Sequence, residues 1–149
     1  MEIVVREANT SDIATLIKFN CALADETENI LLDATILRSG IERALRLGDC
    51  QYFIAELEGR IVGQTMITSE WSDWRNGRMW WMQSVYVHPD YRKRGVFHKI
   101  FKTIETQAEQ NPEIKALRLY VMQDNHAGKS AYQNLGMKHS GYVVYEKST

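Results

Sequence analysis

The sequence is poor in proline and cysteine and carries almost no net charge. Its 149 residues include two prolines and two cysteines, and the formal charge is −1 at pH 7. So few prolines, and no serine- or glutamine-rich tract, argue against a disordered tail or a flexible linker. A balanced charge argues against attraction to nucleic acid or to an anionic membrane. We therefore expect an ordered chain that binds neither.

Metal-ligand patterns and long apolar runs are missing as well. Cys21 and Cys50 lie too far apart for a C-x-x-C motif, and the four histidines are scattered, so no metal site is expected. The apolar run at residues 3–5 is far shorter than the roughly 20 residues of a membrane span. These absences predict a cytoplasmic protein with two buried thiols.

Apolar residues are plentiful and their spacing changes along the chain. Hydrophobic residues make up 44% and aromatic residues 10% of the 149 residues, enough for the core of a single domain over residues 1–149. Alternating or β-branched runs predict strands at residues 3–7, 52–55, 61–68, 79–87, 116–122 and 142–145. Spacings of three and four predict helices between residues 12 and 24, 33 and 48, 95 and 112, and 125 and 135.

This order, βααβββαβαβ, predicts an α/β fold of the α+β sandwich type. Neighbouring strands joined by short turns are expected to pair antiparallel. The strand at 79–87, the following helix and the strand at 116–122 form a crossover, which places those two strands parallel at the centre of a mixed sheet.

A basic turn joins the strand at 79–87 to its helix. Arg92, Lys93 and Arg94 precede Gly95 at the start of that helix. Free backbone N–H groups and the positive end of the helix dipole favour a phosphate there. The turn therefore predicts a pyrophosphate site, and the alternative is three solvated surface charges.

Two blocks of sequence resemble the GNAT superfamily of acetyl-CoA-dependent N-acetyltransferases. The first block, Val85-Tyr86-Val87-His88-Pro89 and then Arg92-Lys93-Arg94-Gly95-Val96-Phe97, is similar to the family's apolar-x-Val-x-Pro strand end and its Arg/Gln-x-x-Gly-x-Gly/Ala turn. The second, residues 125–137, resembles N-x-x-A-x-x-x-Y-x-x-x-G-F. Phe97 departs from the pattern, because the family usually has Gly or Ala there; its side chain is expected to turn into the core beside Phe101.

The resemblance implies acetyl-CoA as co-substrate, without a metal, in a cleft where the sheet splays beside the central strand. The implied cofactor-binding residues are Val85 and Val87 for pantetheine, Arg92, Lys93, Arg94, Gly95, Val96 and Phe97 for the pyrophosphate, and Asn125 from the second block. Tyr132 resembles the family's proton donor to the departing thiolate. The alternative for Tyr132 is simple packing on the sheet.

The general base and the acceptor site are less visible in the sequence. Glu70, near the end of the third strand, is a candidate base, although a solvated glutamate or deprotonation through water would fit equally. Glu26 and Glu28 lie between the first two predicted helices, where acidic side chains would suit a cationic amine, unless that loop is merely solvated. The tryptophans near the Asn-Gly turn, at 71, 74, 80 and 81, predict core packing, a pocket wall or a dimer surface.

These features favour an N-acetyltransferase that moves an acetyl group from acetyl-CoA to a primary amine of a small molecule or peptide, by direct attack in a ternary complex. The alternative is a non-catalytic acyl-CoA-binding domain of the same fold, and a homodimer is left open. RNA binding is disfavoured because the sequence has only one short basic patch.

Overall fold

The computed structural model of the protein describes residues 2–149, which form five strands and four α-helices. The strands are β1 (Ile3–Glu7), β2 (Cys50–Leu57), β3 (Arg60–Ser72), β4 (Gly77–Val87) and β5 (Ile114–Leu119). The helices are α1 (Ile13–Glu28), α2 (Ala34–Arg46), α3 (Val96–Glu109) and α4 (His126–Asn134). The predicted order of elements is therefore confirmed as far as α4.

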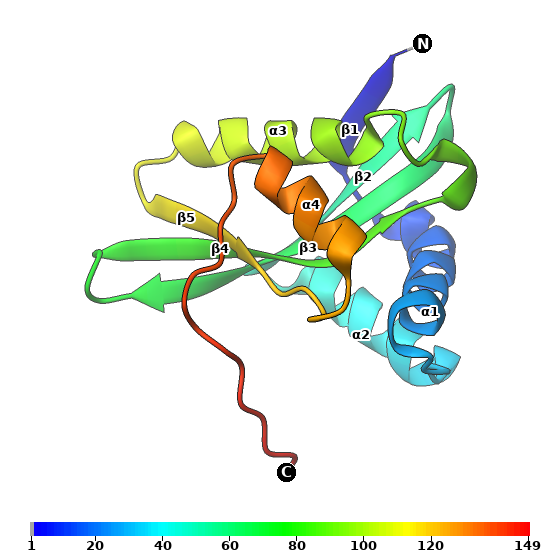
Figure 1. The fold of residues 1–149 in the computed structure, drawn as a ribbon. Helices are drawn as coiled ribbons and strands as arrows, with labels where there is room; N and C mark the ends of the chain where they lie inside the picture. The colour runs from blue at the N-terminus through cyan, green and yellow to red at the C-terminus, as the bar shows by residue number, and fades with distance from the viewer. Residues whose placement is uncertain (1) are drawn as a thin grey trace.

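The strands form one open sheet in the order β1-β2-β3-β4-β5, with α3 along one face and α1 and α2 against the other (Figure 1). All neighbouring pairs are antiparallel except β4 and β5, which are parallel, as the crossover predicted. None of the helices within residues 2–149 is long and apolar enough to cross a membrane.

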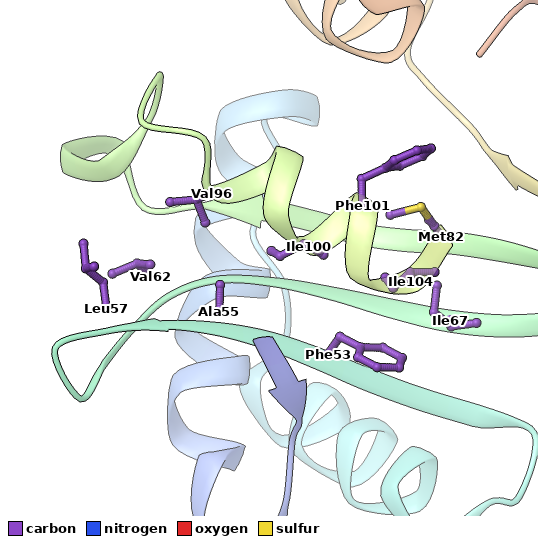
Figure 2. Close-up of a cluster of buried hydrophobic side chains, with 10 residues drawn as sticks. All are labelled: Phe53, Ala55, Leu57, Val62, Ile67, Met82, Val96, Ile100, Phe101 and Ile104. Atoms are coloured by element: carbon purple, nitrogen blue, oxygen red, sulfur yellow. The ribbon is translucent and has the colours of Figure 1, made fainter. Parts of the chain in front are cut away.

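Side-chain alternation on β2 explains why helices cover both faces. Phe53 and Ala55 belong to the apolar cluster beneath α3, which Figure 2 shows together with Ile100 and Ile104 of that helix. The intervening Tyr52 and Ile54 belong to a second cluster, which includes side chains of α1 and α2. A strand that is buried on both faces reads as a continuous apolar run, as residues 52–55 do.

Helix α1 is longer than predicted. It passes the end of its apolar stripe at Ala24 and continues to Glu28, so Glu26 and Glu28 lie in its last turn and not in a loop. The helix ends where Asn29 adopts a left-handed conformation (φ 53°) and its N–H bonds back to the carbonyls of Ala24 and Asp25. The helix therefore ends at a backbone cap, one exposed turn beyond the last buried residue.

The prediction of a strand at residues 142–145 is wrong. No helix or strand forms after Asn134, and Tyr142, Val143, Val144 and Tyr145 are 67 to 94% exposed. Local hydrogen bonds turn the chain here, since the N–H of Gly141 donates to Nδ1 of His139 and that of Tyr142 to Oγ of Ser140. Valine and tyrosine favour strands, but a strand also needs a neighbour to pair with.

Candidate active site

The sheet opens between β4 and β5. Their pairing runs only from Arg78 to Met82 on β4 and ends at Leu119 on β5, whereas β4 continues to pair with β3 as far as Val87. Within the described chain, the last part of β4 therefore has a strand on one side only. This is the splay that the sequence resemblance implied.

A bulge in β4 lies at the start of this opening. Ser84 has a positive φ of 53°, and the register between β3 and β4 shifts there. Two fully buried side chains of β3 hold the bulge: Nε2 of Gln64 donates to the Ser84 carbonyl (3.0 Å), and Oγ1 of Thr65 donates to the Gln83 carbonyl (2.9 Å). Sequence reasoning missed both residues, although two adjacent polar residues in an apolar strand were a visible signal.

Val85 and Val87 present their main-chain groups to the opening. The N–H of His88 donates to the Val62 carbonyl on β3. Because main-chain groups alternate between the two edges of a strand, those of Val85 and Val87 point to the opposite edge. The Val87 carbonyl there accepts a hydrogen bond from Nε of Arg92 at 2.8 Å.

The turn before α3 is shaped by two left-handed residues, Lys93 (φ 62°) and Gly95 (φ 83°). The first helical hydrogen bond runs from the Lys99 N–H to the Gly95 carbonyl. The N–H groups of residues 96–98 consequently have no partner within the helix. A side-chain carbon built on Gly95 would meet no atom within 4 Å, so the space beside this residue is open.

Phe97 turns inward from this helix start, as expected. Its ring packs against the cluster beneath α3, with its centroid 6.2 Å from that of Phe101. It also meets the ring of Tyr132 on α4 edge-on, at 5.6 Å. The side chain at the position where the family usually has Gly or Ala therefore leaves the main-chain turn uncovered and contacts the candidate proton donor.

Tyr132 lies half-buried on α4, and desolvation of its phenol raises the pKa of this group. The hydroxyl is consequently protonated at neutral pH, as a proton donor must be. Asn125 caps the same helix, because its Oδ1 accepts from the Gly128 N–H at 2.9 Å. A side-chain carbon on Gly128 would lie 2.6 Å from the Asn125 amide, so the missing side chain lets the cap close.

Arg92 and Glu26 form an ion pair between two sites that the sequence analysis kept separate. Nη2 of Arg92 lies 2.7 Å from Oε2 of Glu26, and its guanidinium lies over the ring of Tyr86 at 5.3 Å. The Tyr86 hydroxyl donates to the other oxygen of Glu26 (3.2 Å). Burial, and then the Glu26 carboxylate, raise the pKa of Tyr86. Tyr86 is a third residue that sequence reasoning missed.

Glu70 lies on β3 among aromatic and cationic side chains of β4 and β5. Its Oε1 accepts from the indole N–H of Trp81 (2.8 Å), and its Oε2 faces Nη1 of Arg118 (3.3 Å). The ring of Trp81 packs against that of Tyr120 with centroids 4.9 Å apart. Both carboxylate oxygens of the candidate base therefore already accept hydrogen bonds.

The four tryptophans do not form one wall. Trp80 packs against the cluster beneath α3, whereas Trp74 is 91% exposed at the hairpin tip. Trp71 is half-exposed beneath the guanidinium of Arg78. Core packing, the favoured expectation, holds only for Trp80.

Cys21 and Cys50 are free thiols. Both are half-buried, so the expectation that they are fully buried is wrong. Among residues 2–149, no three His, Cys, Asp or Glu side chains come close enough together to hold a metal ion.

Comparisons with known proteins agree with this architecture. The model of the acetyltransferase (GNAT) family matches residues 19–137. The crystal structure of a possible acetyltransferase from Clostridium difficile 630 is 38% identical, with a TM-score of 0.92 over 100% of this chain and 99% of that one. Thialysine N-epsilon-acetyltransferase of Bos taurus is 25% identical over 145 residues, which is 90% of this chain and 83% of the relative.

A third comparison concerns the fold alone. A predicted acetyltransferase from Clostridium acetobutylicum, solved with acetyl-CoA, is 18% identical, with a TM-score of 0.80 over 98% of this chain and 96% of that one. The family match includes both sequence blocks, the turn before α3 and the capped start of α4. The chain therefore belongs to the GNAT family of acetyltransferases.

Proposed function

We propose that this protein is an N-acetyltransferase that transfers the acetyl group of acetyl-CoA to a primary amine of a small molecule or peptide. The observation that carries the proposal is the open turn before α3, with its unpaired N–H groups, beside the one-sided stretch of β4. An anion site next to a free strand edge suits a ligand that has a pyrophosphate at one end and an amide-containing arm at the other.

The residues of the turn fit the anionic part of this co-substrate. The N–H groups of Val96 and Phe97 would bind the pyrophosphate, with Lys93 and Arg94 providing positive charge and Gly95 leaving room for close approach. Arg92 would contribute a third cation at the edge of the site. Asn125 would act mainly through α4, since its cap fixes the helix that carries Tyr132.

The strand edge and Tyr132 would bind the thioester end of acetyl-CoA. Main-chain groups of Val85 and Val87 would hold the pantetheine arm. When bound, acetyl-CoA supplies the thioester carbon that the amine attacks, and the CoA thiolate that leaves must take up a proton. Tyr132 would hold that proton on its hydroxyl, and Glu70 or a water molecule would take the proton from the attacking amine. Because both oxygens of Glu70 are engaged, transfer of that proton to water is the simpler route.

A coupled assay tests the proposed reaction. The protein is incubated with acetyl-CoA and a panel of primary amines, while free thiol and acetylated product are measured and acetyl-CoA binding is followed by calorimetry. We expect thiol release that requires an amine and yields equimolar product. Binding of acetyl-CoA without transfer to any amine would favour the non-catalytic acyl-CoA-binding alternative, and failure to bind would overturn both.

For the acceptor we propose a cationic amine that is drawn to Glu26 and Glu28. The name of the bovine relative states that it acetylates the ε-nitrogen of thialysine, which is an amine. In this chain both carboxylates stand on the exposed last turn of α1, with Glu26 beside Arg92. Their exposure limits the contribution of each ion pair to about 0.2 to 1 kcal/mol.

The variant E26Q/E28Q tests this acceptor site. We expect the KM for the best cationic amine to rise about 1.4- to fivefold for each carboxylate that contacts it, with kcat unchanged, and this rise to shrink in high salt. The KM for acetyl-CoA should not rise, because the anion site loses no cation. E109Q, at the far end of α3, is the matched control. If the KM for the amine is the same in E26Q/E28Q as in E109Q, or if the best acceptor is anionic, the assignment is contradicted.

A further inference from the structure

Three aromatic rings and one guanidinium contact one another beside β5. The ring of Tyr120 packs against that of Trp81, with centroids 4.9 Å apart. The guanidinium of Arg118 lies 5.9 Å from the centroid of the Trp81 ring and 5.7 Å from that of Tyr142. We refer to Tyr120, Trp81, Arg118 and Tyr142 as the aromatic cluster. The proposed acetyl transfer assigns no role to these four side chains.

The aromatic cluster borders the opening between β4 and β5. The pairing of the two strands ends at Met82 on β4 and at Leu119 on β5. Trp81 directly precedes Met82, and Tyr120 directly follows Leu119. The contact between the two rings therefore lies where the strands begin to separate, next to the place proposed for the thioester.

The cluster lies on the face of the sheet opposite α3. Leu117 and Leu119 pack beneath α3, so the intervening Arg118 points to the other face, together with the rings that it contacts. Helices α1 and α2 pack on the part of that face formed by β2, β3 and β4. On the β5 part, Tyr120 and Tyr142 are 58 and 69% exposed. The cluster is therefore accessible to a ligand.

The proposed acceptor carboxylates lie on the same face. Phe19 of α1 packs against Tyr86, with ring centroids 5.1 Å apart, and the Tyr86 hydroxyl donates to Glu26. Along β4, Tyr86 and Trp81 are separated by about 16 Å, at ~3.3 Å per residue. An amine that reaches the opening midway between them is about 8 Å from each. One acceptor can therefore reach both Glu26 and the aromatic cluster.

The charges at the cluster select an uncharged ligand group. Glu70 accepts from the indole N–H of Trp81 at 2.8 Å, which fixes that ring, and its other oxygen faces Arg118 at 3.3 Å. The two opposite charges compensate each other. A further cation would be repelled by Arg118, and an anion by Glu70. Tyrosine rings and guanidinium groups both stack on flat groups, so an uncharged planar ring fits best.

We infer that the aromatic cluster binds an uncharged planar ring of the acceptor, so that the preferred acceptor is a primary amine joined to such a ring by a short linker. The ring stacks on Tyr120, the member of the cluster next to the opening, while the amine lies at the opening. The inference rests on the proposed acetyl transfer and adds a determinant of acceptor specificity to it. Glu26 and Glu28 attract the charged amine, whereas the cluster recognises the rest of the molecule.

The variant Y120L tests the inference with two matched amines, 3-phenylpropylamine and 3-cyclohexylpropylamine. The amines have the same charge and the same linker, and they differ in whether the ring is flat. Leucine keeps an apolar side chain at the exposed position 120 and removes the stacking surface. Y120F, which keeps the ring, and Y145L, which replaces a tyrosine that is 94% exposed outside the cluster, are the controls. Kinetics with acetyl-CoA give kcat and KM for each amine.

We expect wild type, Y120F and Y145L to favour the phenyl over the cyclohexyl amine by about 3- to 10-fold in kcat/KM, mainly through KM. In Y120L this preference should disappear, because KM for the phenyl amine rises while KM for the cyclohexyl amine changes little. A wild type without preference for the flat ring overturns the inference, as does a preference that Y120L retains.

Calorimetry with CoA in place of acetyl-CoA separates this inference from the proposed function. The Kd for 3-phenylpropylamine should be about 3- to 10-fold higher in Y120L than in wild type. That result without any acetylated product would support the cluster and overturn the proposed transfer. Acetylation of amines with the same Kd in both proteins would overturn the cluster alone. Failure of the wild type to bind 3-phenylpropylamine would also overturn the inference.

Discussion

The variant Y132F is expected to lower kcat about 10²- to 10⁴-fold, the range typical for loss of a general acid, and to leave the Kd for acetyl-CoA nearly unchanged. Phenylalanine keeps the ring that meets Phe97 edge-on and removes only the hydroxyl. The thiolate would then have to leave without a proton from the protein. Single-turnover kinetics should show the loss in the chemical step.

The pH profile gives an independent readout for Tyr132. A proton donor is active while it is protonated, and burial raises the pKa of this phenol above its ordinary value. Wild-type kcat should therefore show no alkaline fall due to Tyr132 below about pH 10, the ordinary pKa of tyrosine. Y52F, which removes the hydroxyl of a buried tyrosine of the second core cluster, is the control and should retain kcat. An unchanged kcat in Y132F, with chemistry rate-limiting, would leave Tyr132 as a packing residue.

The variant G95D is expected to weaken acetyl-CoA binding about 10- to 100-fold, which corresponds to about 1.4 to 2.8 kcal/mol. Two effects contribute: the left-handed backbone (φ 83°) disfavours any side chain, and a carboxylate beside the helix N-terminus repels the pyrophosphate. Steric clash should contribute little within the free protein, because the added carbon meets open space. Calorimetry on the folded variant measures the loss.

The variant G95N separates charge from backbone strain. Asparagine has nearly the size of aspartate and, like aspartate, can adopt the left-handed conformation, so the two variants share the backbone strain. Because asparagine adds no charge, G95N should weaken binding less than G95D does. The gap between the two variants should narrow as salt is added, because it is electrostatic in origin. If folded G95D binds acetyl-CoA as tightly as wild type, the pyrophosphate does not bind at this turn.

The sequence was most informative where a single residue pattern decides a local structure. The apolar run at residues 52–55 indicated a strand buried on both faces, and the basic Gly-containing turn indicated the start of α3. Family blocks then identified residues of the opening. Strand order followed from short connections and from the handedness of the crossover.

Features that depend on partners distant in the chain could not be predicted in this way. Glu26 and Arg92 are 66 positions apart, and nothing in either local pattern indicates that they meet. The bulge at Ser84 depends on Gln64 and Thr65 from the neighbouring strand. The segment at 142–145 has the composition of a strand, but whether it forms one depends on the strand edge available to it.

The ion pair between Arg92 and Glu26 has a thermodynamic consequence for the proposed enzyme, because it links residues assigned to different ligands. A phosphate that attracts Arg92 leaves Glu26 without its counter-charge, and the carboxylate then attracts a cationic amine more strongly. Such coupling is reciprocal, so a bound amine should increase the affinity for acetyl-CoA by the same factor. The two substrates should therefore bind with positive cooperativity, and the ternary complex should be more populated than their separate affinities imply.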